Sequence, residues 1–207
     1  MKKILTITIA LLAFNVNAQT TFKGFEIGVQ AAMNLSVVRG TVFDAEDEVN
    51  FIARPGIFLF GTKDLTDKLY LKPGIGFNFK GGETVENYES FDGEIETYYT
   101  KDKFTFLELP VMVGYKATDN IFLEAGLSFG ITLSATSDYE EEGEKESENI
   151  KEFVNNTELG FHIGGKYIIN SKFAGGIRYF TGSNLNKSQI LTKVNIEGFA
   201  FFMEMKI

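Results

Sequence analysis

"IFLEAGLSFGITLSA", residues 121–135, alternates apolar side chains with small or polar ones. The apolar positions are Ile121, Leu123, Ala125, Leu127, Phe129, Ile131 and Leu133, and those between them include Glu124, Gly126, Ser128, Gly130, Thr132 and Ser134. Successive side chains of a strand point to opposite faces, so this period of two predicts a strand with one apolar and one polar face. The direction of the apolar face decides between a soluble secreted barrel and one embedded in a membrane.

Seven further segments show the same pattern, which gives eight predicted strands. They are 25–34, 51–61, 69–80, 105–116, 158–168, 172–181 and 190–207. The segment 51–61 is apolar on both faces. The last segment changes phase near Glu197 and Gly198, which predicts a bulge there.

The connections between these segments alternate in length. Short connections (62–68, 117–120 and 170–171) alternate with long polar ones (35–50, 81–103, 135–153 and 182–189). In an up-and-down barrel, alternate connections lie at opposite ends, and outer-membrane barrels have short periplasmic turns and long extracellular loops. The pattern predicts an all-β fold, an eight-stranded antiparallel up-and-down transmembrane β-barrel with long acidic extracellular loops and both termini on the periplasmic side.

The interior of an eight-stranded barrel is just wide enough to be filled by side chains. Phe77, Phe79, Phe129 and Phe161, together with the aliphatic residues, would overfill it, and glycines on the outside would pack poorly. We therefore predict that the apolar face points outward. The topology then places outward aromatic residues at both ends, as membrane interfaces favour: Phe25, Tyr115, Tyr167 and Phe173 at the periplasmic ends, and Phe51, Phe79 and Tyr179 at the opposite ends.

All three prolines, Pro55, Pro73 and Pro110, fall inside predicted strands. Because proline cannot donate to a ladder, each requires a bulge, a strand end or a missing ladder bond.

The N-terminus has the layout of a secretory signal, with Lys2 and Lys3 before an apolar run and a small-residue cleavage site at Val16-Asn17-Ala18. The apolar run of about 11 residues is too short to span a bilayer. We predict a cleaved signal peptide at 1–18, export through the general secretory pathway, and a single barrel domain at 19–207. Removing the two lysines changes the formal charge from −8 to −10, which argues against a nucleic-acid partner. The chain has no cysteine, so burial, strand ladders or a membrane must hold it together.

Three motifs follow one another along the chain: Pro73-Gly74 ahead of Lys80-Gly81, then Leu107-Glu108-Leu109-Pro110, then Leu123-Glu124-Ala125-Gly126. With their surroundings (69–82, 104–135 and 159–180), they resemble the PorT-type outer-membrane β-barrel family of Bacteroidota. The resemblance implies that fold over nearly the whole mature chain. The protein that gives the family its name is linked to type IX secretion. None of the matching residues is known to confer that role, so the resemblance does not assign it to this chain. The ending Met205-Lys206-Ile207 departs from the family's common terminal aromatic residue.

The predicted inward face carries charges of both signs and the only histidine. These residues are Glu26, Arg54, Lys72, Lys80, Glu108, Lys116, Glu124, Glu158, His162, Lys166, Arg178 and Glu204. Buried charges must be paired, so we interpret the set as a structural ion-pair network that fills the lumen. A narrow ion or solute path is the alternative, and we expect negligible conductance.

The acidic residues concentrate in the long connections. They are Asp44, Glu46, Asp47 and Glu48 in the first, Glu83, Glu86, Glu89, Asp92, Glu94, Glu96 and Asp102 in the second, and those of 138–152 in the third. We interpret them as solvated loops. The alternative is weak divalent-cation binding that bridges to lipopolysaccharide, although no EF-hand spacing is present.

The leading hypothesis for function is a structural or interaction component of the outer membrane, an accessory of secretion or surface assembly that contacts membrane lipid, lipopolysaccharide and protein partners. A ligand-binding or transport barrel comes second. An integral lipid-modifying enzyme comes third, because inward-facing Ser128 and His162 have residue types that acyl transfer uses. The sequence assigns no catalytic residue, cofactor or metal ligand.

Overall fold

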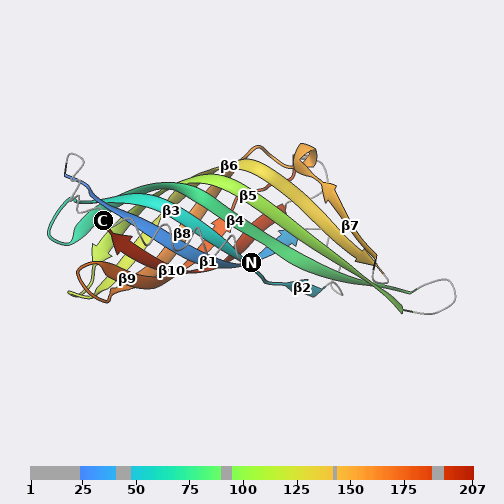
Figure 1. Cartoon of the computed structure of the whole chain (residues 1–207), viewed down its shortest axis with the longest axis horizontal. Helices are drawn as coiled ribbons and strands as arrows, with labels where there is room; N and C mark the ends of the chain where they lie inside the picture. Colours follow the sequence, from blue (N-terminus) through green and yellow to red (C-terminus); the bar gives the residue numbers. More distant parts are fainter. Residues whose placement is uncertain (1–23, 41–47, 90–94, 142–143, 188–193) are drawn as a thin grey trace.

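The computed structural model describes residues 24–40, 48–89, 95–141, 144–187 and 194–207, and these form one antiparallel sheet of ten strands (Figure 1). The elements are β1 (Glu26–Gly40), β2 (Glu48–Asn50), β3 (Ile52–Asp64), β4 (Leu69–Glu89), β5 (Ile95–Lys116), β6 (Ile121–Glu141), β7 (Glu144–Asn149), the 3₁₀ helix η1 (Lys151–Phe153), β8 (Thr157–Ile168), β9 (Phe173–Gly182) and β10 (Val194–Lys206). Within this part of the chain, no helix combines the length and the apolar character needed to cross a membrane. The predicted signal peptide lies outside the described residues.

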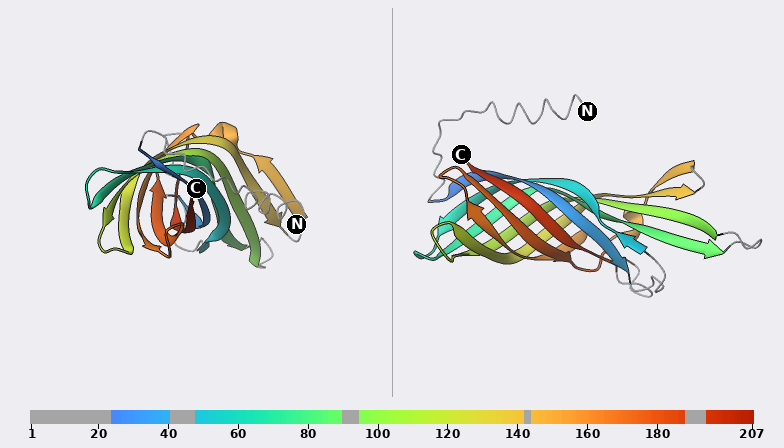
Figure 2. Two further views of the ribbon diagram at one scale, coloured as in Figure 1. Left: turned by 60° about the vertical axis from the view of Figure 1, so that its left-hand side comes forward. Right: turned by 90° about the horizontal axis from the view of Figure 1, so that it is seen from below.

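Antiparallel pairing runs β1–β3–β4–β5–β6–β8–β9–β10 and returns from β10 to β1. The sheet therefore closes on itself, and Figure 2 shows it curved around a central axis. The short strands β2 and β7 pair with β4 and β6. These two strands, which the sequence analysis did not predict, lie in segments that it assigned to loops.

Short turns at 65–68, 117–120 and 169–172 share one end of the sheet, here called the turn end. In each turn a side-chain oxygen accepts a hydrogen bond from the backbone N–H that opens the next strand: Thr66 from Leu69 (3.0 Å), Thr118 from Ile121 (3.0 Å) and Asn170 from Phe173 (2.9 Å). Such side-chain-to-backbone bonds favour tight turns. Gly28 pairs with Lys206, so β1 begins and β10 ends at the turn end as well.

At the opposite end, β4, β5 and β6 continue far beyond their neighbours, with 21, 22 and 21 residues. The prediction of long loops at 35–50, 81–103 and 135–153 is therefore wrong in large part, because 35–40, 81–89, 95–103, 135–141 and 144–149 are strand. The extensions at 83–89, 97–103 and 136–141, together with β7, are here called the outer sheet, and most of their residues are polar. Apolar alternation, the signal used for strands, is absent from them, although their Thr, Val and Tyr residues suit strands.

The apolar face points outward along the closed sheet. Leu127 is 65% exposed and Phe129 40%, whereas Glu124 between apolar neighbours is 2% exposed. The outward aromatic residues Tyr115, Tyr167 and Phe173 are exposed near the turn end and Phe51 near the other, while Phe25, Phe79 and Tyr179 are partly exposed. An apolar exterior with aromatic residues at its edges matches the pattern that lipid favours.

The strand irregularities differ from prediction. The prediction of a bulge at Glu197 and Gly198 is wrong, because both residues of β10 pair with β1 and β9 without a register shift. The inward face of β10 carries the apolar residues Ile196, Ala200 and Phe202. Because both faces of this strand carry apolar residues, the hydrophobic pattern does not show which positions point inward. The shift lies instead between Thr105 and Phe106, which pair with Ser134 and Thr132. Beyond it Ser134, predicted to face inward, is exposed, and Ala135 is buried.

Each proline lies where a ladder is interrupted or ends, as the sequence required. The β3–β4 ladder pairs Phe60 with Gly74 and resumes only at Lys63 and Leu71, skipping Pro73. The β4–β5 ladder jumps from the Pro73–Val111 pair to the Gly76–Glu108 pair, skipping Pro110. Pro55 lies one residue beyond the Gly56–Asn78 pair that ends its ladder with β4.

Candidate functional site

The enclosed side of the sheet holds two buried groups of charged residues. The first, here called the turn-side cluster, contains Tyr70, Lys72, Glu124, Lys166, Arg178 and Glu204, contributed by five different strands. Glu124 accepts hydrogen bonds or ion pairs from Tyr70 (2.7 Å), Lys72 (3.3 Å), Lys166 (3.1 Å) and Arg178 (3.0 Å). Glu204 pairs with Lys72 and, at 3.0 Å, with Lys166. Charge-assisted bonds of this kind compensate for the loss of hydration.

The second group, here called the histidine cluster, contains Asn78, Lys80, Glu108, Glu158 and His162. Lys80 Nζ lies 3.1 Å from a Glu108 oxygen and 2.8 Å from a Glu158 oxygen. The Asn78 amide donates to Glu108 at 2.7 Å. Lys80 also lies 5.0 Å from the Phe106 ring centroid and 5.2 Å from that of Phe180, within cation–π range.

Beyond the histidine cluster the interior becomes apolar. This region, here called the apolar plug, consists of Val38, Phe104, Phe106, Ala135, Val154, Phe180, Leu185, Ile196 and Ala200. Val154 and Leu185 come from connecting segments rather than strands, and the Asn155 N–H donates to the Leu185 carbonyl at 2.7 Å. The connecting segments thus fold over the apolar plug at the end opposite the turns.

The structure brings nine of the twelve predicted lumen residues into these two clusters. The other three lie elsewhere: Glu26 pairs with Lys206 (2.5 Å) and Lys116 with Asp64 (2.9 Å) at the turn end, and Arg54 donates to the carbonyls of Lys80 and Phe104. The prediction did not include Tyr70 and Asn78. Their even-numbered positions in β4, shared with Lys72 and Lys80, were the signal that would have found them.

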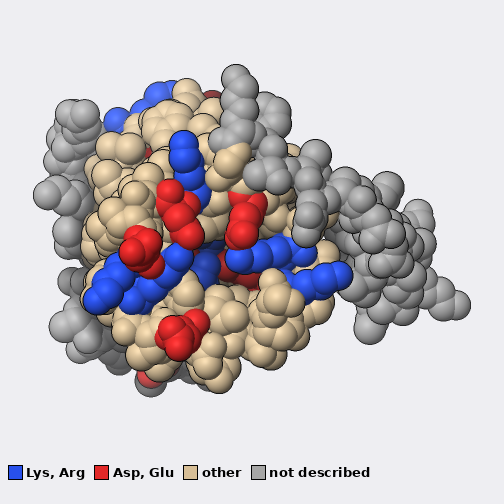
Figure 3. All heavy atoms as spheres, turned by 90° about the vertical axis from the view of Figure 1, so that its left-hand side faces the viewer, with Lys and Arg blue, Asp and Glu red and all other residues tan. Residues whose placement is uncertain are grey.

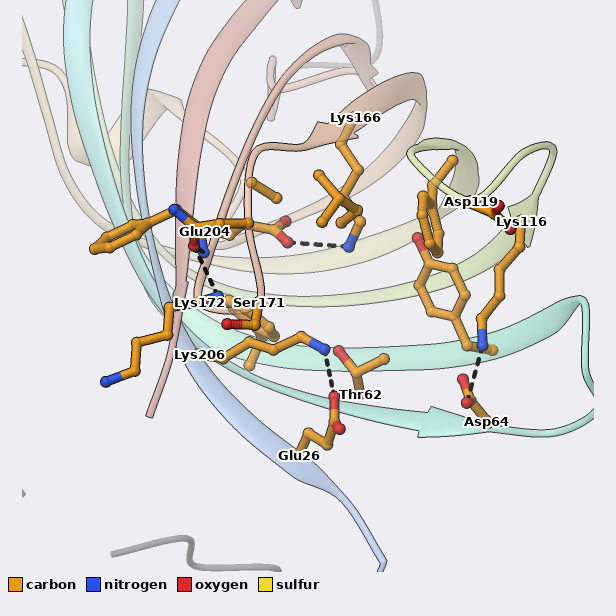
Figure 4. A pocket seen from close by; sticks show the side chains of 17 residues that line it. Glu26, Thr62, Asp64, Lys116, Asp119, Lys166, Ser171, Lys172, Glu204 and Lys206 are labelled. Carbon is orange, nitrogen blue, oxygen red and sulfur yellow. Dashed lines mark hydrogen bonds and ion pairs between the residues drawn. The ribbon is translucent and has the colours of Figure 1, made fainter. Parts of the chain in front are cut away.

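A cavity of about 240 Å³ opens at the turn end. Figure 3 looks onto this end and shows lysine and acidic side chains gathered around the hollow. In Figure 4 the Glu26–Lys206 and Lys116–Asp64 pairs stand at its rim, and Lys166 and Glu204 form its floor. Three members of the turn-side cluster, Tyr70, Lys166 and Glu204, therefore line this cavity.

A second, shallower groove of about 610 Å³ lies on the outer sheet. Its lysines pair with acids across strands: Lys101 with Glu83 (2.8 Å), Lys145 with Glu140 (2.7 Å), and Lys103 with Asp138. The hydrogen bond from Lys103, together with one from Ser147, lowers the pKa of the Asp138 carboxyl. Burial raises the pKa of the neighbouring Asp102, and a hydrogen bond from Ser137 offsets part of that effect.

The acidic partners in these ion pairs belong to the segments for which divalent-cation binding is the alternative interpretation. Of the acidic residues in these segments, Asp44, Glu46, Asp47, Asp92, Glu94 and Glu142 lie outside the described residues. Among the residues that the structure does describe, no group of three or more His, Asp or Glu side chains has a metal-binding arrangement.

The family described as "Outer membrane protein beta-barrel domain" matches residues 17–188 of the chain. No protein with curated annotation matches significantly. Among solved structures, Ail, the attachment invasion locus protein of Yersinia pestis, aligns over 88% of this chain and 97% of its own, with 14% identity and a TM-score of 0.48. Neisserial surface protein A aligns over 89% and 97%, with 10% identity and a TM-score of 0.44. OprG from Pseudomonas aeruginosa aligns over 88% and 96%, with 9% identity and a TM-score of 0.37.

Proposed function

This chain belongs to the outer membrane protein β-barrel domain family, and we propose that it is an integral outer-membrane protein with a structural or interaction role. In this proposal the eight strands of the closed pairing cycle form a transmembrane barrel, the turn end faces the periplasm, and the outer sheet stands in the extracellular medium. The outward apolar face supports this placement, because the exposed large side chains would otherwise face water.

The filled interior carries the functional part of the proposal. The two clusters bury four cations (Lys72, Lys80, Lys166 and Arg178) and four carboxylates (Glu108, Glu124, Glu158 and Glu204), and the apolar plug follows them along the axis. An ion crossing this interior would have to separate buried pairs and displace packed aromatic rings, which costs several kcal/mol for each charge left unpaired. A conducting channel is therefore disfavoured, and function is assigned to the two ends.

The first test is conductance. Purified protein inserted into a planar bilayer should give no steady current above that of the detergent control. Stable, reproducible open-state steps would contradict a filled interior and would favour the transport hypothesis.

A second test addresses partners. We propose an accessory of secretion or surface assembly, of PorT type as the motif resemblance suggests, with outer-membrane lipid and lipopolysaccharide as its surroundings. A pull-down from gently solubilised outer membrane should recover a defined complex. Lys116→Glu at the turn end and Lys101→Glu on the outer sheet would locate the contact, since one variant should lose the complex and the other retain it. Recovery of the barrel alone would contradict the proposal.

A ligand-binding barrel is the second candidate, and the turn-end cavity favours it, because about 240 Å³ approaches the lower size limit of small-molecule sites. Saturable binding of a periplasmic solute, abolished by Lys116→Glu, would favour this candidate over the interaction role. Two further proposals concern the N-terminus and the acidic segments. We propose that the chain is exported by the general secretory pathway with removal of 1–18, and that the acidic segments bind divalent cations that bridge to lipopolysaccharide.

A further inference from the structure

The groove of about 610 Å³ on the outer sheet lies on the same face of the strands as the apolar exterior. In β5 the odd-numbered side chains point outward, from the exposed Val111 and Leu109 to Lys101 and Tyr99. The register shift between β5 and β6 leaves this alternation intact, because its extra residue is Leu133 of β6. The groove therefore continues the surface that faces lipid in the proposed membrane placement.

The outward face also supplies nine of the eleven residues that line the groove. Residues directly opposite each other in antiparallel strands point to the same face, so the register of β4 to β7 places these side chains. The nine are Glu83, Tyr99, Lys101, Lys103, Thr136, Asp138, Glu140, Lys145 and Ser147. The other two, Tyr139 and Glu146, pair with each other at positions of the opposite face. The groove is thus built mainly on the outside of the sheet.

The height of the groove distinguishes between two kinds of lipid headgroup. Lys103, Lys101 and Tyr99 follow Leu107, the aliphatic residue that ends the outward apolar run of β5, by four, six and eight residues. At about 3.3 Å per residue and a strand tilt of about 40°, they stand about 10–20 Å above Leu107 along the membrane normal. The polar layer of one phospholipid leaflet is only about 5–8 Å thick. Most of the groove therefore lies beyond phospholipid headgroups, at the level of the oligosaccharide of an outer-leaflet glycolipid.

The charges of the groove favour a neutral ligand. Each of its three lysines contacts a carboxylate of a neighbouring strand. An isolated phosphate would have to displace a carboxylate from a lysine, and a divalent cation would have to displace a lysine from a carboxylate. A polyhydroxyl ligand displaces neither, because an ammonium group has three N–H donors and a carboxylate has about four acceptor positions. The paired groups thus offer both donors and acceptors to the hydroxyls of a saccharide.

Tyr99 adds an aromatic surface to these polar groups. This residue is 44% exposed, and tyrosine combines an apolar ring with a polar tip. The ring is suited to pack against the C–H face of a sugar whose hydroxyls bond to the neighbouring ion pairs. The lysines give a further observation: in the described outer sheet, Lys101, Lys103 and Lys145 all point outward, and the inner face carries no lysine. The strongest donors are therefore concentrated on the face that meets the membrane.

We propose that this groove binds the oligosaccharide headgroup of a glycolipid in the outer leaflet of the same membrane, an inference that rests on the membrane placement of the proposed function. Tyr99 packs against a sugar ring, and the Lys101–Glu83 pair donates to and accepts from its hydroxyls. The contact requires no metal ion. It holds the outer sheet, which extends beyond the neighbouring strands, against the carbohydrate layer of the membrane.

The test is the retention of lipopolysaccharide by the mature barrel during size-exclusion chromatography in detergent. The buffer contains EDTA, so that bridging by divalent cations does not contribute. The wild type should retain lipopolysaccharide, and Tyr99→Ala should retain at least fivefold less. Tyr98→Ala is the matched control, because Tyr98 is the preceding residue and points to the other face of β5, and it should behave as the wild type. The double variant Lys101→Met with Glu83→Gln, which removes an ion pair without leaving an unpaired charge, should also lose retention.

Two outcomes would overturn the inference. One is equal retention by the wild type and all variants. The other is retention of lipid A, which lacks the oligosaccharide, to the same extent as intact lipopolysaccharide, because acyl chains or phosphates would then hold the lipid. The proposed function fails separately, if the mature protein does not insert into bilayers. A barrel that inserts and retains no lipopolysaccharide in EDTA contradicts the saccharide site alone.

Discussion

The Nε2 atom of His162 lies 2.8 Å from the Oγ atom of Ser128, inside the closed sheet where both side chains are buried. The same nitrogen lies 3.3 Å from Glu108 Oε1, and Nδ1 has no hydrogen-bond partner among the described residues. In a serine–histidine–acid relay, the nucleophile and the acid must contact opposite nitrogens of the ring. Here they share one nitrogen, so the three residues are arranged as a polar core and not as a relay.

The first prediction follows from this shared nitrogen. Ser128→Ala and His162→Ala should leave the lipids of the outer membrane unchanged, because the arrangement cannot activate the serine. Ser128→Ala should lose about 1 kcal/mol of stability with the hydrogen bond it removes, and His162→Ala should lose more, because it also leaves a cavity where the buried ring lies beside Phe180. Mass spectrometry of envelope lipids from strains carrying the wild type or either variant would check this. A lipid species that depends on both residues would establish an enzyme instead.

The second prediction concerns Lys80, which pairs with both Glu108 and Glu158. Lys80→Met should lower the free energy of unfolding by about 3–5 kcal/mol, because two carboxylates then remain buried without their cation. Urea unfolding of the protein refolded in detergent would measure the loss.

The control for this variant removes the unpaired charges as well. Adding Glu108→Gln and Glu158→Gln to Lys80→Met should recover most of the lost stability, since neutral amides need no counter-ion. A triple variant as unstable as the single one would show that Lys80 acts through packing against Phe106 and Phe180, not through charge.

The third prediction compares two glycines of β6. A Cβ added at Gly126 would lie 2.7 Å from Met112 Cα, a backbone atom that cannot move aside cheaply, whereas at Gly130 its nearest neighbour would be Phe106 Cδ1 at 3.4 Å, an ordinary contact. Gly126→Ala should therefore destabilise the protein by about 1–3 kcal/mol or prevent folding, and Gly130→Ala should be tolerated. Equal yields of folded protein and equal unfolding midpoints would refute the close approach of β5 and β6.

The fourth prediction concerns pH and the outer sheet. The hydrogen bond from Lys103 lowers the pKa of Asp138 in the folded protein, so this group stabilises the outer sheet above its unfolded pKa of about 3.9. That contribution disappears as pH falls through the lowered folded value. Burial raises the pKa of Asp102 in the folded protein, so the effect of this group on stability is opposite to that of Asp138. The free energy of unfolding falls as pH rises from the unfolded pKa of Asp102 through its raised folded pKa.

Two substitutions separate these effects. At neutral pH, Asp138→Asn should open the outer sheet more readily than the wild type, and Asp102→Asn less readily, and both differences should vanish in acid. Amide hydrogen exchange of residues 97–103, corrected for the intrinsic pH dependence of exchange, is the measurement. The same direction of change in both variants would contradict the opposite pKa shifts.

The strands that carry apolar alternation could be predicted from the sequence, because a sheet with an apolar outer face requires an apolar side chain at every second position of each strand. Residues 121–133 show this, with Leu127 outward and Glu124 inward as predicted. The same signal failed wherever both faces of a strand have similar polarity. Residues 95–103 are mostly polar, so the sequence predicts a loop where the structure has part of β5, and the apolar inward face at Ile196 and Phe202 suggests a bulge that the ladder does not contain.

In the strands with unbroken apolar alternation, the sequence by itself determined which residues face inward, because strand geometry assigns alternate positions to opposite faces regardless of the partner strand. It therefore identified Lys72, Glu124, Lys166 and Glu204 as enclosed charges. Only the tertiary structure decided which of them meet, since Glu124 and its three cations come from four strands. Contacts between them depend on the relative register and tilt of these strands around the closed sheet. For the same reason the linear pattern does not show that Ser128 and Glu108 share a single histidine nitrogen, or that Arg178 Nε lacks a hydrogen-bond partner within the described residues.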